Sequence, residues 1–316
     1  MKIGFATMLS IFNRRKSRHR FALVLVALLL ASCAGGIAEF NGPDAPRFFP
    51  YAVNQRPRVA LVLGAGGPRG FAHIGVLKVL EENGIDADLV VGASVGAMIG
   101  ALYAERVPAT EIEKIAIELD PKKFIGISTS GITGNGNAIE NFINERTGGK
   151  ALDGFSRKFA VTAANRAGNA LTVFNRGNTA GAVRASSATP GQFAPVRIRG
   201  VEYQDGDEAE PVPIRVARDL GAEVVIAVDV SAHVSAIPPS APAEWAVRDR
   251  MRARKVQAQA MYADVVIHPD LGYYASISEA YRRMCIQRGA DAARAALPKI
   301  RAALAKLQSA TRPVAG

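Results

Sequence analysis

The sequence lacks a long apolar run. Its uninterrupted apolar stretch near the N-terminus covers only residues 21–30, whereas a helix that crosses a bilayer needs roughly 20 apolar residues. An internal repeat and a second domain boundary are also absent, although 49% of the residues are apolar and can build a sizeable core. We therefore expect one folded domain and no bilayer-spanning helix at 21–30.

Cysteine is scarce as well, with only Cys33 and Cys285 in the chain. A basic region precedes the apolar stretch, and Leu30-Ala31-Ser32-Cys33 follows it. Positive charge, a short apolar core and small residues in this order are typical of a signal peptide. The last four residues resemble the lipobox of bacterial lipoproteins, which implies that residues 1–32 are removed and that Cys33 is lipidated. The alternative is an ordinary secretory cut beside an incidental cysteine.

Lipidation of Cys33 has two consequences. It leaves Cys285 without a partner, so that no intrachain disulfide is expected and Cys285 packs as a small helix residue. The residue after the cysteine is Ala34 and not an Asp, which is compatible with sorting of the lipoprotein to the outer membrane. We expect a chain anchored by lipid in the bacterial cell envelope, on the periplasmic side of the outer membrane, with residues 33–57 as a flexible tether.

Charge of one sign is not strongly in excess once the signal peptide is removed. The precursor carries +11, from 39 basic and 28 acidic residues. Residues 1–32 hold six basic residues and no acidic one, so the mature chain has 39 − 6 = 33 basic residues against 28 acidic, or +5. This excess suits an anionic membrane surface and does not favour nucleic acid as a partner.

Apolar periodicity indicates the fold class. Residues 59–63 and 89–91 are short apolar runs typical of buried strands, and residues 71–82 and 95–104 have helical spacing after glycine-rich turns. The order strand, turn, helix, repeated, predicts an α/β fold with a mostly parallel sheet that helices cover on both faces.

The C-terminal half continues in the same style. The sequence predicts a loop at 231–243 near the mouth of a site, a long helix at 243–262 and a helix at 277–296. We place the folded domain at 58–298 and a helical tail at 299–316.

Three segments carry the chemistry: residues 64–70 (Gly-Ala-Gly-Gly-Pro-Arg-Gly), residues 92–96 (Gly-Ala-Ser-Val-Gly) and Asp205-Gly206. The second matches the nucleophile-elbow pattern G-x-S-x-G, between a strand and a helix, in which Gly92 and Gly96 leave room for a tight turn that exposes Ser94. Ester cleavage also needs a base and donors for the oxyanion.

The glycine segment allows two interpretations. A nucleotide-phosphate loop fits poorly, because no Lys-Ser/Thr closes it. An oxyanion hole of backbone N–H groups fits better, with Gly66, Gly67, Arg69 or Gly70 as donors, since Pro68 has no N–H. The Arg69 side chain is compatible with a lipid phosphate or with a structural ion pair that holds the loop.

The base is Asp205 or a histidine. His73, His233 and His268 have no motif around them, although a Ser-Asp-His order with His233 or His268 is available. Asp205 follows a strand, precedes a glycine and lies upstream of Pro211-Val212-Pro213. We favour Asp205.

Together the residues 63–77, 92–97, 185–191 and Asp205-Gly206 before Pro-Val-Pro resemble the patatin-like phospholipase family. The resemblance implies a three-layer α/β/α fold and a Ser–Asp dyad, with Ser94 as nucleophile and Asp205 as base, and Gly206 in its turn. It also implies an oxyanion loop at residues 66–70 and hydrolysis of a phospholipid or another lipid ester without a metal or other cofactor. The rival interpretations are a triad esterase and a lipid-binding envelope lipoprotein without turnover.

The sequence departs from the family after Asp205. Ala65 replaces a glycine of the loop, and Asp207 stands where relatives have Gly or Ala, followed by Glu208 and Glu210. These carboxylates form either a solvated acidic loop or a cluster that raises the pKa of Asp205 by like-charge repulsion.

Overall fold

The computed structural model describes residues 37–310, except 125–126, 129–130, 133 and 135. The expected signal peptide and the expected lipidation site, Cys33, lie outside the described residues. No helix in the described part of the chain combines the length and the apolar character that a bilayer crossing requires.

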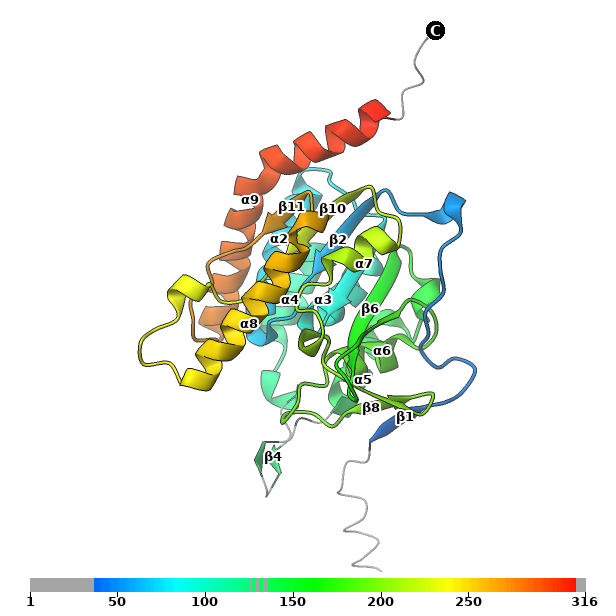
Figure 1. Cartoon of the computed structure of the whole chain (residues 1–316), viewed down its shortest axis with the longest axis vertical. Helices are drawn as coiled ribbons and strands as arrows, with labels where there is room; N and C mark the ends of the chain where they lie inside the picture. Colours follow the sequence, from blue (N-terminus) through cyan, green and yellow to red (C-terminus); the bar gives the residue numbers. More distant parts are fainter. Residues whose placement is uncertain (1–36, 125–126, 129–130, 133, 135, 311–316) are drawn as a thin grey trace, which may run out of the picture. The chain divides into compact units, whose positions relative to one another are not determined.

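One central sheet organises the fold (Figure 1). The strands are β1 Ala38–Phe40, β2 Val59–Leu63, β3 Leu89–Ala93, β6 Lys158–Asn165, β7 Leu171–Phe174, β8 Val196–Ile198, β9 Val201–Gln204, β10 Val224–Val228 and β11 Val265–Ile267, with β4 Ile127–Ser128 and β5 Gly131–Ile132 in a separate hairpin. The α-helices are α2 Phe71–Glu82, α3 Val95–Ala104, α4 Ala109–Glu118, α5 Gly136–Thr147, α6 Thr179–Ser186, α7 Ile214–Asp219, α8 Ala243–Gln259 and α9 Glu279–Ala310. The sheet order is β1-β8-β9-β6-β3-β2-β10-β11, and β7 also pairs with β6.

Strand direction defines where loops meet. The strands β6, β3, β2, β10 and β11 are parallel to one another, and β1 is parallel to β8. The strands β7 and β9 run antiparallel to β6. The mostly parallel sheet is thus confirmed. Because parallel strands end together, the residues after β2, β3 and β10 lie at one edge of the sheet, here named the carboxyl edge.

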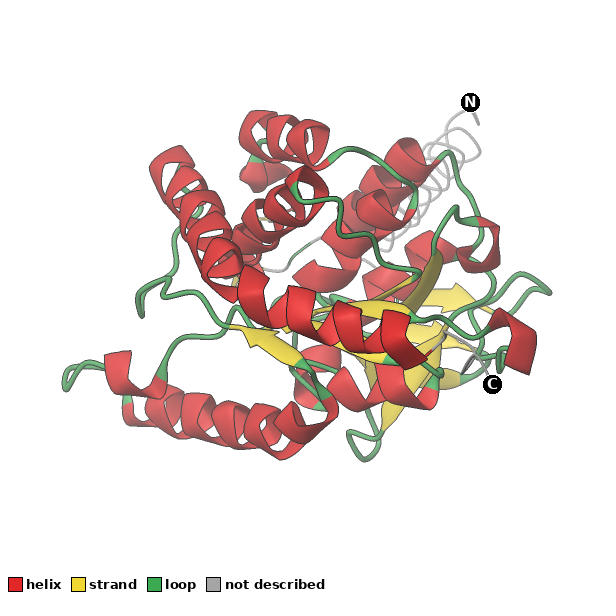
Figure 2. Cartoon of the chain, turned by 90° about the horizontal axis from the view of Figure 1, so that it is seen from above, coloured by secondary structure: helices red, strands yellow, loops and turns green. Residues whose placement is uncertain are grey.

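Helices cover both faces of the sheet, which confirms the three-layer α/β/α architecture (Figure 2). In β2, Leu61 and Leu63 face a core shared with α2 to α6 and α9, while Ala60 and Val62 face a second core with α7 and α8. Buried strands with apolar residues on both faces are what a parallel sheet between two helix layers requires.

The helices α2 and α9 pack at glycine positions. A Cβ on Gly75 of α2 would lie 1.8 Å from the Ile286 carbonyl oxygen, and one on Gly289 of α9 would lie 2.0 Å from that of Ala72. The two backbones therefore touch directly, because neither glycine has a side chain to separate them.

The predicted bounds of β2, α2 and α3 agree with the structure, while two other regions differ from expectation. In the expected tether, β1 pairs with β8 and Ala45 is buried, since backbone pairing at a sheet edge needs no apolar run. At the expected end of the domain, α9 continues through Pro298. A proline usually breaks a helix, but Ala293 and Ile300 are buried in the same core and hold both sides of this one in place.

Candidate active site

The sheet register brings Ser94 and Asp205 together. Strand β3 pairs with residues 158–162 of β6, and β9 pairs with residues 164–165 in the opposite direction. Strand β7 pairs with residues 161–164 and fills the other side of β6, so β3 and β9 run towards each other along one side. Ala93 is opposite Thr162 and Gln204 is opposite Ala164, so the next residues, Ser94 after β3 and Asp205 after β9, both reach the position of the β6 residue between them. Two segments that are distant in sequence therefore end at the same point.

Ser94 occupies a strained turn between β3 and α3. Its φ of 54° and ψ of −125° lie in a region that non-glycine residues rarely adopt. A Cβ on Gly96 would lie 2.1 Å from the Leu63 carbonyl oxygen, and one on Gly92 would lie 2.5 Å from the Cα of Ala97. The two glycines thus let α3 approach the sheet closely, as the nucleophile-elbow pattern predicts.

The side chains of Ser94 and Asp205 form a direct hydrogen bond. Ser94 Oγ donates to Asp205 Oδ2 over 2.8 Å, and the two residues are only 8% and 3% exposed. Thr189 Oγ1 donates to the same oxygen over 2.7 Å, and the Asp207 N–H donates to Asp205 Oδ1 over 2.9 Å. The carboxylate is therefore fixed by three donors, of which one is the serine hydroxyl.

Burial raises the pKa of Asp205 from 3.8 to about 6, and the nearby charge of Asp207 adds to the effect. The hydrogen bonds from Asp207, Thr189 and Ser94 act in the opposite direction. Asp207 thus acts in the direction that the acidic-cluster hypothesis predicts, as the smaller of the two causes, and the effect on the reaction stays a prediction. Arg252 Nη1 donates to Asp207 Oδ2 over 2.7 Å, which partly neutralises that charge. A carboxyl with a pKa near 6 is an effective general base at neutral pH.

The glycine loop offers fewer free amides than the sequence suggests. Residues Gly67–Gly70 form a 3-10 turn in which the Arg69 N–H donates to the Gly66 carbonyl oxygen over 3.2 Å. Gly70 is buried against α3, since a Cβ there would lie 2.4 Å from the Val95 side chain. The amides of Gly66 and Gly67 have no acceptor among the hydrogen bonds of the described residues. These two are therefore the stronger oxyanion candidates of the predicted four, and Arg69 and Gly70 shape the loop.

The polar side chains of His73 and Arg69 hold this loop in place. His73 is fully buried, which lowers its pKa to about 4, so that the neutral ring donates from Nε2 to the Gly64 carbonyl oxygen over 2.8 Å. The Arg69 guanidinium donates to the carbonyl oxygens of Gly272 and Tyr273. The expected ion pair of Arg69 is therefore replaced by carbonyl contacts, because the 270–274 segment presents backbone oxygens there.

Arg252 of α8 connects the two halves of the site. While Nη1 contacts Asp207, Nη2 donates to the Ala65 carbonyl oxygen over 2.5 Å. One guanidinium thus joins the glycine loop to the turn that carries Asp205. Sequence reasoning missed this residue, because Arg252 lies 45 and 187 positions from its two partners and no local pattern indicates these contacts. It gave Thr189 no role of its own, although residues 185–191 resemble a segment of the family.

His233 and His268 lie in a cluster of their own. Their rings stack with centroids 3.8 Å apart, and His268 Nε2 lies 3.0 Å from the Ser231 carbonyl oxygen and 3.6 Å from Asp229 Oδ2. No hydrogen bond or ion pair within the described ranges links either ring to Ser94 or Asp205. This arrangement does not form a Ser-Asp-His triad.

An apolar pocket of about 90 Å³ lies between α2, α3, α4 and α5. Val95, the residue after Ser94, lines it together with Met98 of α3 and Phe71 of α2. Further apolar side chains come from α4 and from Phe142 of α5, and no charged residue lines the pocket. Its position and lining suit a hydrocarbon chain.

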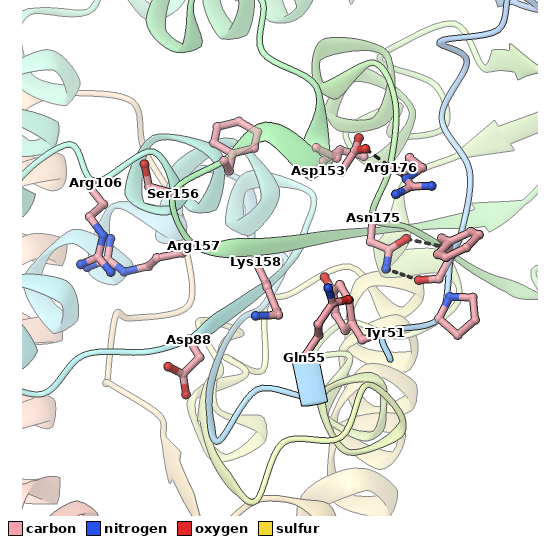
Figure 3. A pocket seen from close by; sticks show the side chains of 14 residues that line it. Tyr51, Gln55, Asp88, Arg106, Asp153, Ser156, Arg157, Lys158, Asn175 and Arg176 are labelled. Atoms are coloured by element: carbon pink, nitrogen blue, oxygen red, sulfur yellow. Dashed lines mark hydrogen bonds and ion pairs between the residues drawn. The ribbon is translucent and has the colours of Figure 1, made fainter. Parts of the chain in front are cut away.

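A polar cavity of about 460 Å³ lies at the other edge of the sheet (Figure 3). Asp88, which precedes β3, and Lys158, which begins β6, both line it, together with Arg157 and Arg176. Since Ser94 follows the opposite end of β3, this cavity is separate from the Ser94 site. Among the residues that the structure describes, no group of three or more His, Cys, Asp or Glu side chains is arranged to hold a metal ion.

The family model for patatin-like phospholipases matches residues 61–218. The chain belongs to the patatin-like phospholipase family. It is 31% identical over 213 residues to an uncharacterized NTE family protein of Mycobacterium bovis, covering 64% of this chain and 58% of that protein. It is also 34% identical over 185 residues to the human patatin-like phospholipase domain-containing protein 6, covering 55% of this chain and 13% of that one.

A lysophospholipase NTE1 of Coccidioides immitis is 33% identical over 186 residues, which cover 55% of this chain and 12% of that protein. The chain thus spans little more than half the length of the mycobacterial relative and about an eighth of the eukaryotic ones. Among solved structures, VipD from Legionella pneumophila matches with a TM-score of 0.54 and 15% identity, over 82% of this chain and 70% of that one. This likeness extends the agreement in fold.

Proposed function

We propose that this protein is a serine acyl-ester hydrolase of the phospholipase A or lysophospholipase type. Ser94 is the nucleophile, Asp205 is its base and the amides of Gly66 and Gly67 bind the oxyanion. The hydrogen bond of 2.8 Å between Ser94 Oγ and Asp205 Oδ2 carries the proposal, and the apolar pocket that the next residue, Val95, lines supports it. Membership of the patatin-like phospholipase family supports it.

In the first half of the reaction, Asp205 accepts the proton of Ser94 Oγ while this oxygen attacks the ester carbonyl carbon. The negative charge that develops on the carbonyl oxygen is stabilised by the glycine-loop amides. Collapse of the tetrahedral intermediate breaks the bond to the alcohol, which leaves with the proton held by Asp205. The acyl group stays on Ser94 as an ester.

In the second half, Asp205 takes a proton from water, and the hydroxide attacks the acyl-enzyme carbonyl. The intermediate releases the fatty acid, and the proton returns to Ser94 Oγ. Only one base is needed, because Asp205 has a pKa of about 6 and can exchange protons in both directions near neutral pH.

The substrate is a lipid ester whose acyl chain enters the pocket between α2, α3, α4 and α5. Val95, which follows the nucleophile in the chain, lines this pocket together with Phe71, and this supports an acyl chain in the pocket with its carbonyl at Ser94. We further propose that the mature chain is anchored in the bacterial envelope through lipidated Cys33, as its N-terminal pattern predicts. Incorporation of labelled palmitate, lost in Cys33→Ser, tests the anchor.

Labelling with an alkyl fluorophosphonate, combined with release of fatty acid from lysophospholipid, tests the hydrolase. We expect wild-type protein to label and turn over, and Ser94→Ala to do neither. Ser156→Ala removes a hydroxyl in the cavity at the opposite edge of the sheet and serves as the matched control. Lipid binding by a wild-type protein that neither labels nor turns over would instead identify a non-catalytic lipid-binding protein.

A further inference from the structure

The start of helix α8 lies at the same edge of the sheet as the nucleophile. Strands β10 and β11 are parallel neighbours, and α8 is the connection between them. Such a connection leaves from the carboxyl end of the first strand and returns to the amino end of the second. The N-terminal half of α8 therefore begins at the carboxyl edge, where Ser94 follows β3 (Figure 1).

This half of α8 exposes large apolar side chains to solvent. Trp245 is 42% exposed, Val247 53% and Met251 55%, while Ala246 and Val256 of the same helix are buried against the protein. One side of the helix thus holds buried apolar residues, of which Val256 joins the core beneath the sheet, while Val247 and Met251 share the outer side and Trp245 is exposed in the first turn. An exposed cluster of this kind marks an interaction surface.

Basic side chains surround these apolar ones. Arg248, Arg250 and Arg254 are exposed, and no ion pair of the described residues involves Arg250 or Arg254. Arg248 forms an ion pair with the adjacent Asp249, over 3.3 Å, and lies over the Trp245 ring at 5.9 Å. A Trp with aliphatic neighbours and several arginines is the composition of helices that lie in the headgroup region of a membrane.

We propose that the N-terminal half of α8 docks the protein onto an anionic phospholipid bilayer. The α8 docking surface consists of Val247, Arg248, Arg250, Met251 and the following basic residue Arg254, and Trp245 of the first helical turn flanks it beside Arg248. The apolar side chains enter the interface between headgroups and acyl chains, and the arginines contact lipid phosphates. The purpose of this docking, access to lipid esters, rests on the proposed function, whereas the binding itself does not.

The α8 docking surface is continuous with the site. Val247 and Met251 line a groove of about 360 Å³ that extends to Asp207, two residues after Asp205. Arg252, on the inner side of the same helix, contacts Asp207 and the glycine-loop residue Ala65. A bilayer bound to α8 therefore lies next to the segments that carry the base and the oxyanion donors.

The chain contains a single tryptophan, which makes Trp245 a specific probe. Full-length protein with Cys33→Ser and Ser94→Ala has neither the expected anchor nor the expected nucleophile, so neither lipidation nor hydrolysis affects the measurement. On mixing with vesicles of phosphatidylcholine and phosphatidylglycerol, we expect a blue shift of Trp fluorescence and quenching by brominated acyl chains. Vesicles of phosphatidylcholine alone are expected to bind much more weakly.

Charge-reversal variants show whether the arginines of α8, and not the overall charge of the protein, bind the vesicle. Arg250→Glu/Arg254→Glu is expected to weaken partitioning by roughly 30-fold, from about fivefold for each basic residue next to an anionic membrane. Arg288→Glu/Lys299→Glu makes the same charge change on exposed positions of α9 and is expected to have a small effect. Met251→Ser removes apolar contact without a charge change and is also expected to weaken binding.

Absence of a fluorescence change with anionic vesicles, or equal losses in the two charge-reversal variants, would overturn the proposal. Binding of a protein partner in place of lipid would give the first of these results. A wild-type protein that reacts with fluorophosphonate but does not bind vesicles refutes the α8 docking surface alone. One that binds through α8 but neither reacts nor turns over refutes the hydrolase alone.

Discussion

Replacement of Asp205 by asparagine measures what it costs the fold to keep a carboxylate buried beside Ser94. Burial raises the pKa of Asp205 from 3.8 to about 6 in the folded protein. The folded state therefore binds the proton more tightly than the unfolded chain does. This contribution to stability is fully present below pH 3.8 and is lost as the pH rises through about 6.

The size of the effect follows from the difference between the two pKa values. A difference of about two units corresponds to about 3 kcal/mol, since one unit is about 1.4 kcal/mol. About 2 kcal/mol of this is lost between pH 4.5 and pH 8, because the unfolded carboxyl is already partly ionised at pH 4.5. Asparagine carries no charge, so the variant does not lose this stability.

Urea unfolding of wild type and Asp205→Asn at pH 4.5 and pH 8 provides the assay. Relative to wild type, we expect the variant to gain about 2 kcal/mol more at pH 8 than at pH 4.5. Asp219→Asn, at an exposed position of α7, controls for the general effect of removing a carboxylate. The reasoning is wrong if Asp205→Asn changes the stability by the same amount at both pH values.

Substitutions at four further positions test other parts of the site. Thr189→Val removes a hydrogen bond to Asp205, so its pKa is expected to rise and the acidic limb of the kcat/KM profile to move up by roughly one pH unit; an unchanged limb would contradict this. In urea unfolding, Gly96→Ala is expected to destabilise the fold by several kcal/mol, because the added Cβ would collide with backbone atoms. Gly67→Ala has open space for its Cβ but a φ of 54°, so we expect a cost of about 1–2 kcal/mol. Arg252→Met leaves the charge of Asp207 unneutralised, so we expect lower turnover and an acidic limb of the kcat/KM profile at higher pH. Partial rescue by Arg252→Lys in the same assay would separate the charge of this side chain from its shape. An unaltered profile in Arg252→Met would refute the role of Arg252 in joining the two halves of the site.

The sequence predicts the parts of the site that local patterns encode. The G-x-S-x-G segment requires two glycines at a strand–helix turn, and the structure has backbone contacts at Gly92 and Gly96 that allow no side chain. The predicted proximity of Ser94 and Asp205 is also present, although it results from pairing of β3 and β9 with β6 that no local pattern contains. Their catalytic roles stay predictions until they are assayed.

The remaining parts depend on contacts between distant segments. Thr189 and Arg252 contact the Asp205 turn because the segment after α6 and the helix α8 pack beside it. The sequence around Arg252 shows no functional pattern, and the family segment 185–191 does not indicate which of its residues contacts Asp205. The same limit applies to strand β1, which is held by pairing with β8 more than 150 residues away. The predicted separation of the 277–296 helix from a C-terminal tail is wrong for a related reason, since packing on both sides of Pro298 outweighs the local preference of proline.

The glycine contact between α2 and α9 sets a condition on how this enzyme family can vary. Gly289 lies outside the region that the family model matches, yet it lies against the backbone of the helix that continues from the glycine loop. A side chain at position 289 would collide with the backbone of Ala72 and displace α2, together with the glycine loop before it. A homologue that retains all three motifs but replaces the C-terminal helix must therefore supply another backing for α2.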